Sequence, residues 1–399
     1  MFNVKEEAKI LEQEIIHWRR ELHQIPEIGS DLPKTTLFIR NELDKQKLDY
    51  ETYSNMGIRV VIDSGHPGPV FALRADMDAL PITEETGLPF AATGGCMHAC
   101  GHDAHVAILL GTLKLLNNNK DEWIGKVIGL FQPAEETTGG AKQMIEEGCF
   151  ENPKPDIVIN LHIGNIFKNV GNGQIGIRKG SMMASVDAFE VNVKGVGGHG
   201  GRPHQCVDTL LIACEMVQAI QKIVSREISP LHAAVITVGK IQGSPVPNII
   251  PEQTQFCGTI RVFNPDDRDH IERRLKEMLP LIAQANRATA EINFNRYYPP
   301  TVNNSQVVDF LMRTAAKIVG AENVIEIPEA STGTEDFAYY LLEVPGAFGT
   351  LGSVCANADG VVYPHHNPRF ELDEKVFATG VAVYAQCVID FCQQKERFA

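Results

Sequence analysis

The most reactive part of the sequence is a short segment crowded with potential metal ligands. Residues 98–105 read His-Ala-Cys-Gly-His-Asp-Ala-His, which gathers three histidines, a cysteine and an aspartate in a chain with 13 histidines. Cysteine and imidazole are borderline-soft ligands that suit zinc and other late divalent ions. The spacing from Cys100 to His102 is a weak signal by itself, because a buried histidine beside loop histidines gives the same pattern.

A pair of neighbouring glutamates offers a second kind of chemistry. Glu135 and Glu136 follow the apolar run 127–131 closely. Adjacent carboxylates at the end of a buried strand are costly unless a cation is present. One of them can bind a metal while its neighbour acts as a base on water held by that metal. The alternative is a solvated helix start, where glutamate is also favoured.

Further candidate ligands follow other apolar runs. His162 stands at the end of one run, and a His-His pair that ends in His366 lies in a turn-like segment. Asp76 and Asp78 end a third run, and they point to the same face if that strand continues. There they would orient the histidines that bind the metal. Candidates at the ends of several strands are typical of a site assembled along one edge of an α/β sheet.

The elements that must hold these side chains alternate between strands and helices. The apolar pattern predicts, in order, a helix at 5–24, strands at 58–63 and 70–75, a helix at 104–117, and strands at 126–131 and 156–161. Such alternation predicts an α/β domain with a mostly parallel central sheet.

Residues 185–297 follow a different order. The pattern predicts a strand at 186–196, a helix at 206–224, strands at 233–241 and 254–263, a helix at 266–285, and a strand at 290–294. This βαββαβ order is typical of a ferredoxin-like α+β unit. We therefore expect a catalytic metal-binding α/β domain made of residues 1–184 and 298–399, interrupted by an inserted lid and dimerisation domain at 185–297. The cleft between two such domains is the default ligand site.

Composition excludes several classes of protein. The chain carries 36 Lys+Arg against 50 Asp+Glu, a formal net charge of -14, which disfavours nucleic acid and anionic membrane surfaces as partners. Its 9 cysteines form no paired framework, which indicates a reducing compartment. The charged N-terminus does not read as a signal peptide, and the apolar runs are too short to span a bilayer. We expect a cytoplasmic protein.

Taken in order, these motifs resemble a known family of enzymes. The chain is similar to the dinuclear metal-dependent amidohydrolases, which include hippurate hydrolases, N-acetyl-amino-acid deacetylases and indole-acetyl-amino-acid hydrolases. These are related to aminoacylases and glutamate carboxypeptidases. The resemblance covers nearly the whole chain, and outside the segments above it rests on residues 19–29, 195–204, 246–251, 258–263 and 333–340.

The resemblance implies a role for individual residues. The positions that match the family's metal ligands are Cys100, His102, Glu136, His162 and His366. Glu135 matches the general base, and His199 matches a functional histidine of the inserted domain. Asn248 and Arg261 match the groups that hold the substrate carboxylate, and we expect them in neighbouring parts of that domain. Cys96, His98, His105 and His365 lie beside matching positions and are the obvious false positives.

The resemblance also implies an activity. We expect hydrolysis of the amide bond of N-acyl amino acids by water that two divalent ions hold and that Glu135 deprotonates. Zinc or manganese is the expected metal, with cobalt or nickel as alternatives. A homodimer through the inserted domain is expected, since relatives commonly dimerise there. The alternatives are a dipeptidase or carboxypeptidase and, in another class, a non-catalytic metal-binding protein, for which Glu135 would have no use.

Overall fold

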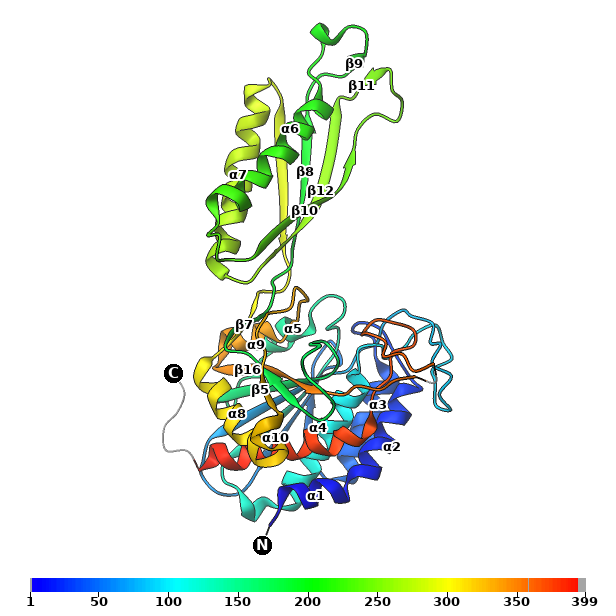
Figure 1. Cartoon of the computed structure of the whole chain (residues 1–399), viewed down its shortest axis with the longest axis vertical. Helices are drawn as coiled ribbons and strands as arrows, with labels where there is room; N and C mark the ends of the chain where they lie inside the picture. The colour runs from blue at the N-terminus through cyan, green and yellow to red at the C-terminus, as the bar shows by residue number, and fades with distance from the viewer. Residues whose placement is uncertain (1, 358, 394–399) are drawn as a thin grey trace. The chain divides into compact units, whose positions relative to one another are not determined.

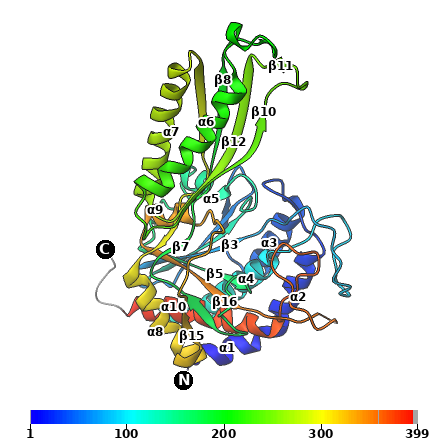
Figure 2. The ribbon, with the colours of Figure 1, turned by 45° about the horizontal axis from the view of Figure 1, so that its top comes forward.

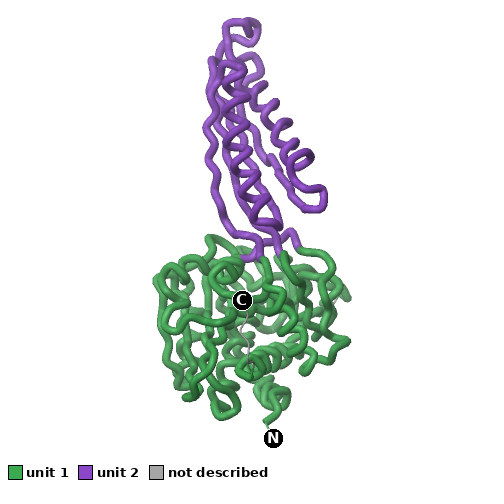
Figure 3. The backbone as a smooth tube through the Cα atoms, turned by 90° about the vertical axis from the view of Figure 1, so that its left-hand side faces the viewer, with its two compact units in different colours: residues 1–182, 302–330, 336–399 green, residues 183–301, 331–335 purple. Residues whose placement is uncertain are grey.

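The computed structural model describes residues 2–357 and 359–393, which form two compact units (Figure 3). Unit 1 comprises Met1–Met182, Val302–Ala330 and Asp336–Ala399, and unit 2 comprises Met183–Thr301 and Ser331–Glu335. The sequence gives no sign of the short return of the chain to unit 2 at Ser331–Glu335.

Unit 1 is built on a mixed, mostly parallel sheet. Among the described residues the strand order is β1-β2-β4-β3-β5-β16-β6-β15, with parallel pairing through β4, β3, β5 and β16. Its central strands are continuous apolar runs, and every residue of β5 is buried, as expected for parallel strands covered on both faces. The strands are β1 Tyr50–Thr52, β2 Ile58–Asp63, β3 Val70–Asp76, β4 Lys126–Gln132, β5 Ile157–Gly164, β6 Ile175–Ile177, β15 Val324–Glu326 and β16 Gly346–Gly352.

Helices cover both faces of this sheet, with α4 and α10 on one face and α5 and α9 on the other (Figures 1 and 2). Helices α4 and α10 are apolar around most of their circumference because they pack on the sheet and on other helices. The helix predicted at 5–24 is divided at Leu11 into two helices. The helices are α1 Val4–Ile10, α2 Glu12–His23, α3 Pro33–Lys45, α4 His102–Asn118, α5 Gly140–Glu146, α8 Ser305–Val319, α9 Ala338–Glu343 and α10 Phe377–Cys392.

One helical stretch of the described residues is long and apolar enough to cross a membrane. It is Glu374–Cys392, and 78% of its apolar window is buried inside the protein. That burial identifies it as a core helix, consistent with the packing of α10 on α4 and α8.

Unit 2 has the predicted βαββαβ order. Its four-stranded antiparallel sheet runs β10-β12-β8-β13, and residues of β8 alternate between buried and partly exposed because helices cover one face. A ribbon of β9 Gly198–His199 and β11 Ile249–Ile250 was not predicted. The main elements are β8 Asp187–Lys194, α6 Thr209–Lys222, β10 Ala234–Gln242, β12 Gln253–Val262, α7 Pro265–Ala285 and β13 Thr289–Arg296. A separate ribbon pairs β7 Gly180–Met183 with β14 Thr301–Asn303.

Candidate metal centre

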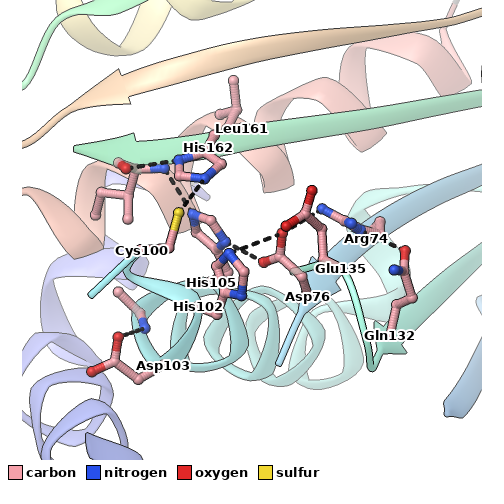
Figure 4. A network of polar contacts seen from close by, with 12 residues as sticks. Arg74, Asp76, Cys100, His102, Asp103, His105, Gln132, Glu135, Leu161 and His162 are labelled. Carbon is pink, nitrogen blue, oxygen red and sulfur yellow. Dashed lines mark hydrogen bonds and ion pairs between the residues drawn. The ribbon is translucent and has the colours of Figure 1, made fainter. Parts of the chain in front are cut away.

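The side chains expected to bind metal come together in unit 1. Figure 4 shows three of them, Cys100, His102 and His162. Cys100 precedes α4, His102 is its first residue, and His162 lies near the carboxyl end of β5. Glu136 follows β4, and the backbone N–H of His366 donates to the carbonyl of Ala99, 2.8 Å away. Strand ends and a helix N-terminus thus place residues far apart in sequence around one point.

The distances between potential ligand atoms are those of a cluster. Cys100 Sγ lies 3.5 Å from His162 Nε2, and His366 Nε2 lies 3.1 Å from Glu136 Oε1. His102 Nε2 lies 3.9 Å from the same Glu136 oxygen. Overlapping groups of these ligands, each spanning at most 4.8 Å, share Cys100, His102 and Glu136, so the cluster offers donors for more than one ion.

Hydrogen bonds at Nδ1 leave Nε2 of two histidines as the atom available to a metal. His102 Nδ1 donates to the carbonyl of Asp78 at 2.9 Å, and His162 Nδ1 donates to the carbonyl of Ile163 at 2.9 Å. A carbonyl only accepts, so Nδ1 of each ring carries a proton, and in the neutral ring the lone pair is on Nε2. His102 Nε2 is buried and has no hydrogen-bond partner among the described residues, which is costly unless a cation binds there. The residues present therefore fit a divalent metal centre.

Burial and neighbouring charges shift the pKa values of the potential ligands. Burial lowers the pKa of His162 well below its usual value, so this ring is neutral and ready to bind. Burial acts in the same direction on His102, but Asp76, Asp78 and Glu136 outweigh it and raise the pKa of His102 to about 10. Burial, followed by the charge of Glu136, raises the pKa of the Cys100 thiol well above its usual value. A surplus of negative charge surrounds these ligands, as a cation site requires.

The two aspartates at the end of β3 support the centre. Asp76 accepts hydrogen bonds from Arg74 at 2.6 Å and from His105, so both carboxylate oxygens are engaged. Asp78 accepts from the backbone N–H groups of Glu135 and Glu136 at 3.0 and 3.1 Å. The Asp78 carboxylate therefore fixes the backbone that carries both glutamates.

Glu135 lies beside the potential ligands in a buried position. Its side chain is buried, with 7% of the residue exposed. Its carboxylate lies within 4.8 Å of the Glu136 carboxylate and the ring of His102. A carboxylate held there can take and return a proton at the centre of the cluster.

Neighbouring histidines of the same motifs have other partners. His105 donates from Nδ1 to Asp76 and accepts from the N–H of Ile163 at Nε2, so it has no lone pair left for a metal. His365 Nε2 donates to the carbonyl of Ile163 at 3.0 Å. His98 is buried, and within the described part of the chain neither of its ring nitrogens has a hydrogen-bond partner.

A buried network that the sequence did not reveal lies next to this site. Arg74 donates to Asp76, to Gln132 at 2.9 Å and to Asp336 at 2.7 Å. Gln132 and the N–H of Ala141 also donate to Asp336. The fully buried guanidinium thereby connects the ends of β3 and β4 with the segment before α9. No pattern in the sequence pairs Arg74 with Asp336, because 262 residues separate them.

In unit 2, His199 lies in the ribbon of β9 and β11. Its Nδ1 accepts from the N–H of Gly201 at 2.9 Å, so the neutral ring carries its proton on Nε2. The β9–β11 pairing places His199 opposite Ile249, and Asn248 precedes Ile249 in the chain. His199 and Asn248 are therefore neighbours, and both are exposed.

Arg261 and Asn248 are not neighbours, so the expectation that they lie in adjoining parts of the inserted domain is wrong. Asn248 lies at the ribbon, which the chain leaves to begin β12 at Gln253, whereas Arg261 is near the opposite end of β12. The extended strand between Gln253 and Arg261 separates the two ends by roughly 25 Å. Arg261 donates instead to the carbonyl of Thr332 at 2.9 Å.

A cluster of potential metal ligands at strand ends, next to a buried carboxylate, is an arrangement that a metal-dependent hydrolase can use. Comparisons with known proteins agree. The model of peptidase family M20/M25/M40 matches residues 72–390. The chain is 39% identical to the N-acetyl-L-cysteine deacetylase of Bacillus subtilis, covering 91% of this chain and 85% of that protein. It is 36% identical to thermostable carboxypeptidase 1 of Saccharolobus solfataricus, covering 97% and 98%.

A solved structure gives the same result. A dinuclear metal-binding peptidase from Bacillus subtilis superposes with a TM-score of 0.81 at 30% identity, covering 96% of this chain and 99% of that one. The chain belongs to peptidase family M20/M25/M40, and it is a hydrolase.

Proposed function

We propose that the protein hydrolyses the amide bond of N-acyl amino acids with two divalent metal ions. The observation that carries this proposal is the cluster of Cys100, His102, Glu136, His162 and His366, with the carboxylate of Glu135 beside it. The relative named as an N-acetyl-L-cysteine deacetylase supports the substrate class, and the dinuclear peptidase supports the number of ions. Zinc or manganese is the proposed metal for these ligands, and cobalt or nickel can take the place of either ion.

Glu135 is the proposed general base. When bound, the ions supply positive charge that polarises a carbonyl group and lowers the pKa of water. Glu135 takes a proton from the attacking water on a carboxylate oxygen and then passes it to the leaving nitrogen. Its burial keeps bulk water from competing for that proton, and the bonds from its backbone and that of Glu136 to Asp78 keep it in place.

The substrate-binding groups are proposed to come from unit 2. Arg261 can hold the substrate carboxylate with parallel hydrogen bonds, and Asn248 can add an amide donor. The Nε2–H of His199 can donate to the carbonyl oxygen as negative charge develops there.

The arrangement within unit 2 favours a site shared by two subunits. One substrate is too small to touch both Arg261 and the pair His199 and Asn248 within one copy of unit 2, because roughly 25 Å of strand separates them. A homodimer solves this by supplying Arg261 from one chain and His199 with Asn248 from the other. Unit 2 offers a place for a second subunit to bind, since β10 is an edge strand of its sheet and can pair with a strand of another chain. Leu211 on α6 is also 69% exposed.

Subunit mixing tests the shared site. Chains with His199→Ala and chains with Glu135→Gln are each expected to be inactive alone. If the site is shared, a mixed dimer holds one intact site, and full exchange restores roughly a quarter of wild-type activity. No recovery after exchange has been verified by mass spectrometry would refute the shared site.

A second candidate is a carboxypeptidase or dipeptidase, favoured by the relative named as a carboxypeptidase. A panel of acetyl, benzoyl and indole-acetyl amino acids, run beside dipeptides, separates the two. Each substrate is assayed after chelation and again with each metal restored. Preferred cleavage of dipeptides would replace the acyl-amino-acid proposal. Full activity in protein shown by elemental analysis to be metal-free would refute both.

A further inference from the structure

Strand β5 extends beyond its partner β3, and along this extension no strand of the described residues pairs with that side of β5. The parallel pairing of β3 with β5 ends at Leu73 and Ile159, whereas β5 continues to Gly164. The metal ligand His162 lies in this extension. On its other side β5 stays paired with β16 as far as Gly164. Buried backbone N–H and C=O groups that face the missing strand need other partners.

Side chains provide those partners. The N–H of Leu161 donates to the hydroxyl of Tyr384 at 2.6 Å, and the N–H of Ile163 donates to His105 Nε2 at 2.8 Å. The carbonyl of Ile163 accepts from His365 Nε2 at 3.0 Å and from His162 Nδ1 at 2.9 Å. Both polar groups of Ile163 are thus bound by histidine rings.

The same two rings flank His162. The centroid of His105 lies 4.6 Å from that of His162, and the centroid of His365 lies 5.4 Å from it, each in an edge-on arrangement. Gly164 has φ +119°. A Cβ atom there would also overlap the His365 ring, so the close approach of this ring requires glycine.

The chemistry of each ring is fixed by its partners. His105 must be unprotonated at Nε2 because it accepts there, and it donates from Nδ1 to Asp76. His365 must carry a proton on Nε2 because the carbonyl of Ile163 only accepts. The two rings are therefore opposite tautomers. His105 accepts from the N–H of Ile163, and His365 donates to the carbonyl of Ile163.

From this geometry we infer that His105 and His365 are positioning residues that replace the missing strand beside β5 and thereby hold His162 Nε2 in the direction of the metal. Neither ring binds metal itself. The bound Ile163 carbonyl remains aligned with His162 Nδ1, and that bond fixes the tautomer that leaves Nε2 free. The inference rests on the proposed metal centre and adds two residues that the ligand set does not contain.

Substitution of each histidine by glutamine or asparagine distinguishes a role in hydrogen bonding from a role in packing. Glutamine places an amide group close to the position of the histidine Nε2, whereas asparagine reaches only the position of Nδ1. His105→Gln and His365→Gln should therefore bind cobalt within about threefold of wild type. His105→Asn and His365→Asn should lose about 10- to 100-fold in cobalt affinity, as expected for residues that orient a ligand. His98→Leu is the matched control, because this buried ring of the same motif makes no hydrogen bond to any residue that the structure describes.

The measurement is titration of the metal-free full chain with cobalt, followed by the visible absorption of the bound ion, with melting curves of each metal-free variant. Equal affinities for the Gln and Asn variants at both positions would overturn the inference. A wild type that binds no cobalt would refute the metal centre itself, and the inference with it. If wild type binds cobalt and only the expected difference between the Gln and Asn variants is missing, the inference fails and the proposed function stands.

A measurement on the wild type does not depend on the folding of any variant. Long-range proton–nitrogen NMR spectra of the zinc-loaded chain, labelled with ¹⁵N-histidine, should show His105 protonated at Nδ1 and His365 protonated at Nε2. The opposite tautomer in either ring would overturn the inference.

Discussion

Metal binding should release protons from the metal-free protein. Asp76 and the other nearby carboxylates raise the pKa of His102 to about 10 despite its burial, and burial raises the pKa of the Cys100 thiol. Both groups are therefore protonated near pH 7, and both must lose a proton to become ligands. The pKa of His162 is lowered, so His162 contributes no proton.

The expected magnitude follows from this count. About two protons should leave when the centre fills at pH 7, so the overall binding constant should rise about 100-fold from pH 7 to pH 8. The metal-free protein has a linked dependence. Because the pKa of His102 is raised from 6.5 to about 10, its protonation stabilises the fold fully below pH 6.5. That contribution is lost as the pH rises towards 10.

Calorimetric titration with zinc, repeated at one pH in buffers of different ionisation heats, measures the released protons directly. Cys100→Ser should release about one proton fewer than wild type, since serine does not ionise in this range. Wild type that releases no protons, or a Cys100→Ser variant that releases as many as wild type, would show that the reasoning about charge in this site is wrong.

Four substitutions give further tests. Glu135→Gln should keep metal and substrate binding but lose turnover by about 10²-fold or more, whereas Glu136→Gln should also lose metal, as elemental analysis would show. Arg261→Ala should cost about 1.5–3 kcal/mol in kcat/KM and discriminate little between free and amidated substrates, while equal cleavage of both by wild type would refute the carboxylate clamp. Asp78→Asn keeps one acceptor for two backbone N–H groups and should destabilise the metal-free protein by about 1–3 kcal/mol in urea unfolding; an unchanged midpoint would contradict that role.

The sequence predicted the elements of the fold better than the contacts between them. Buried strands such as β3 and β5 are continuous apolar runs, and their bounds were predicted to within a few residues because hydrophobic pattern follows burial. The roles of individual atoms were not predictable in this way. The fixed tautomer of His102 depends on a carbonyl 24 residues away, and the partner of Arg74 lies 262 residues away.

Proximity in sequence was misleading in one case. Asn248 and Arg261 are close along the chain, but an extended strand covers about 3.3 Å per residue, so the few residues of β12 carry Arg261 to the far end of unit 2. A helix of the same length would have kept them much closer.

The position of β16 in the central sheet has a consequence for synthesis of the chain. This strand, Gly346–Gly352, lies between β5 and β6 but is made after all of the sheet of unit 2. A chain emerging from the ribosome can complete the contiguous βαββαβ sheet first, while one edge of β5 still lacks its partner. At that stage Cys100, His102, Glu136 and His162 have already been made, and His366 has not. The nascent protein thus passes through a stage in which the edge of β5 is unpaired and the ligand set is incomplete. Residues 346–366 supply both the missing strand β16 and the missing ligand His366.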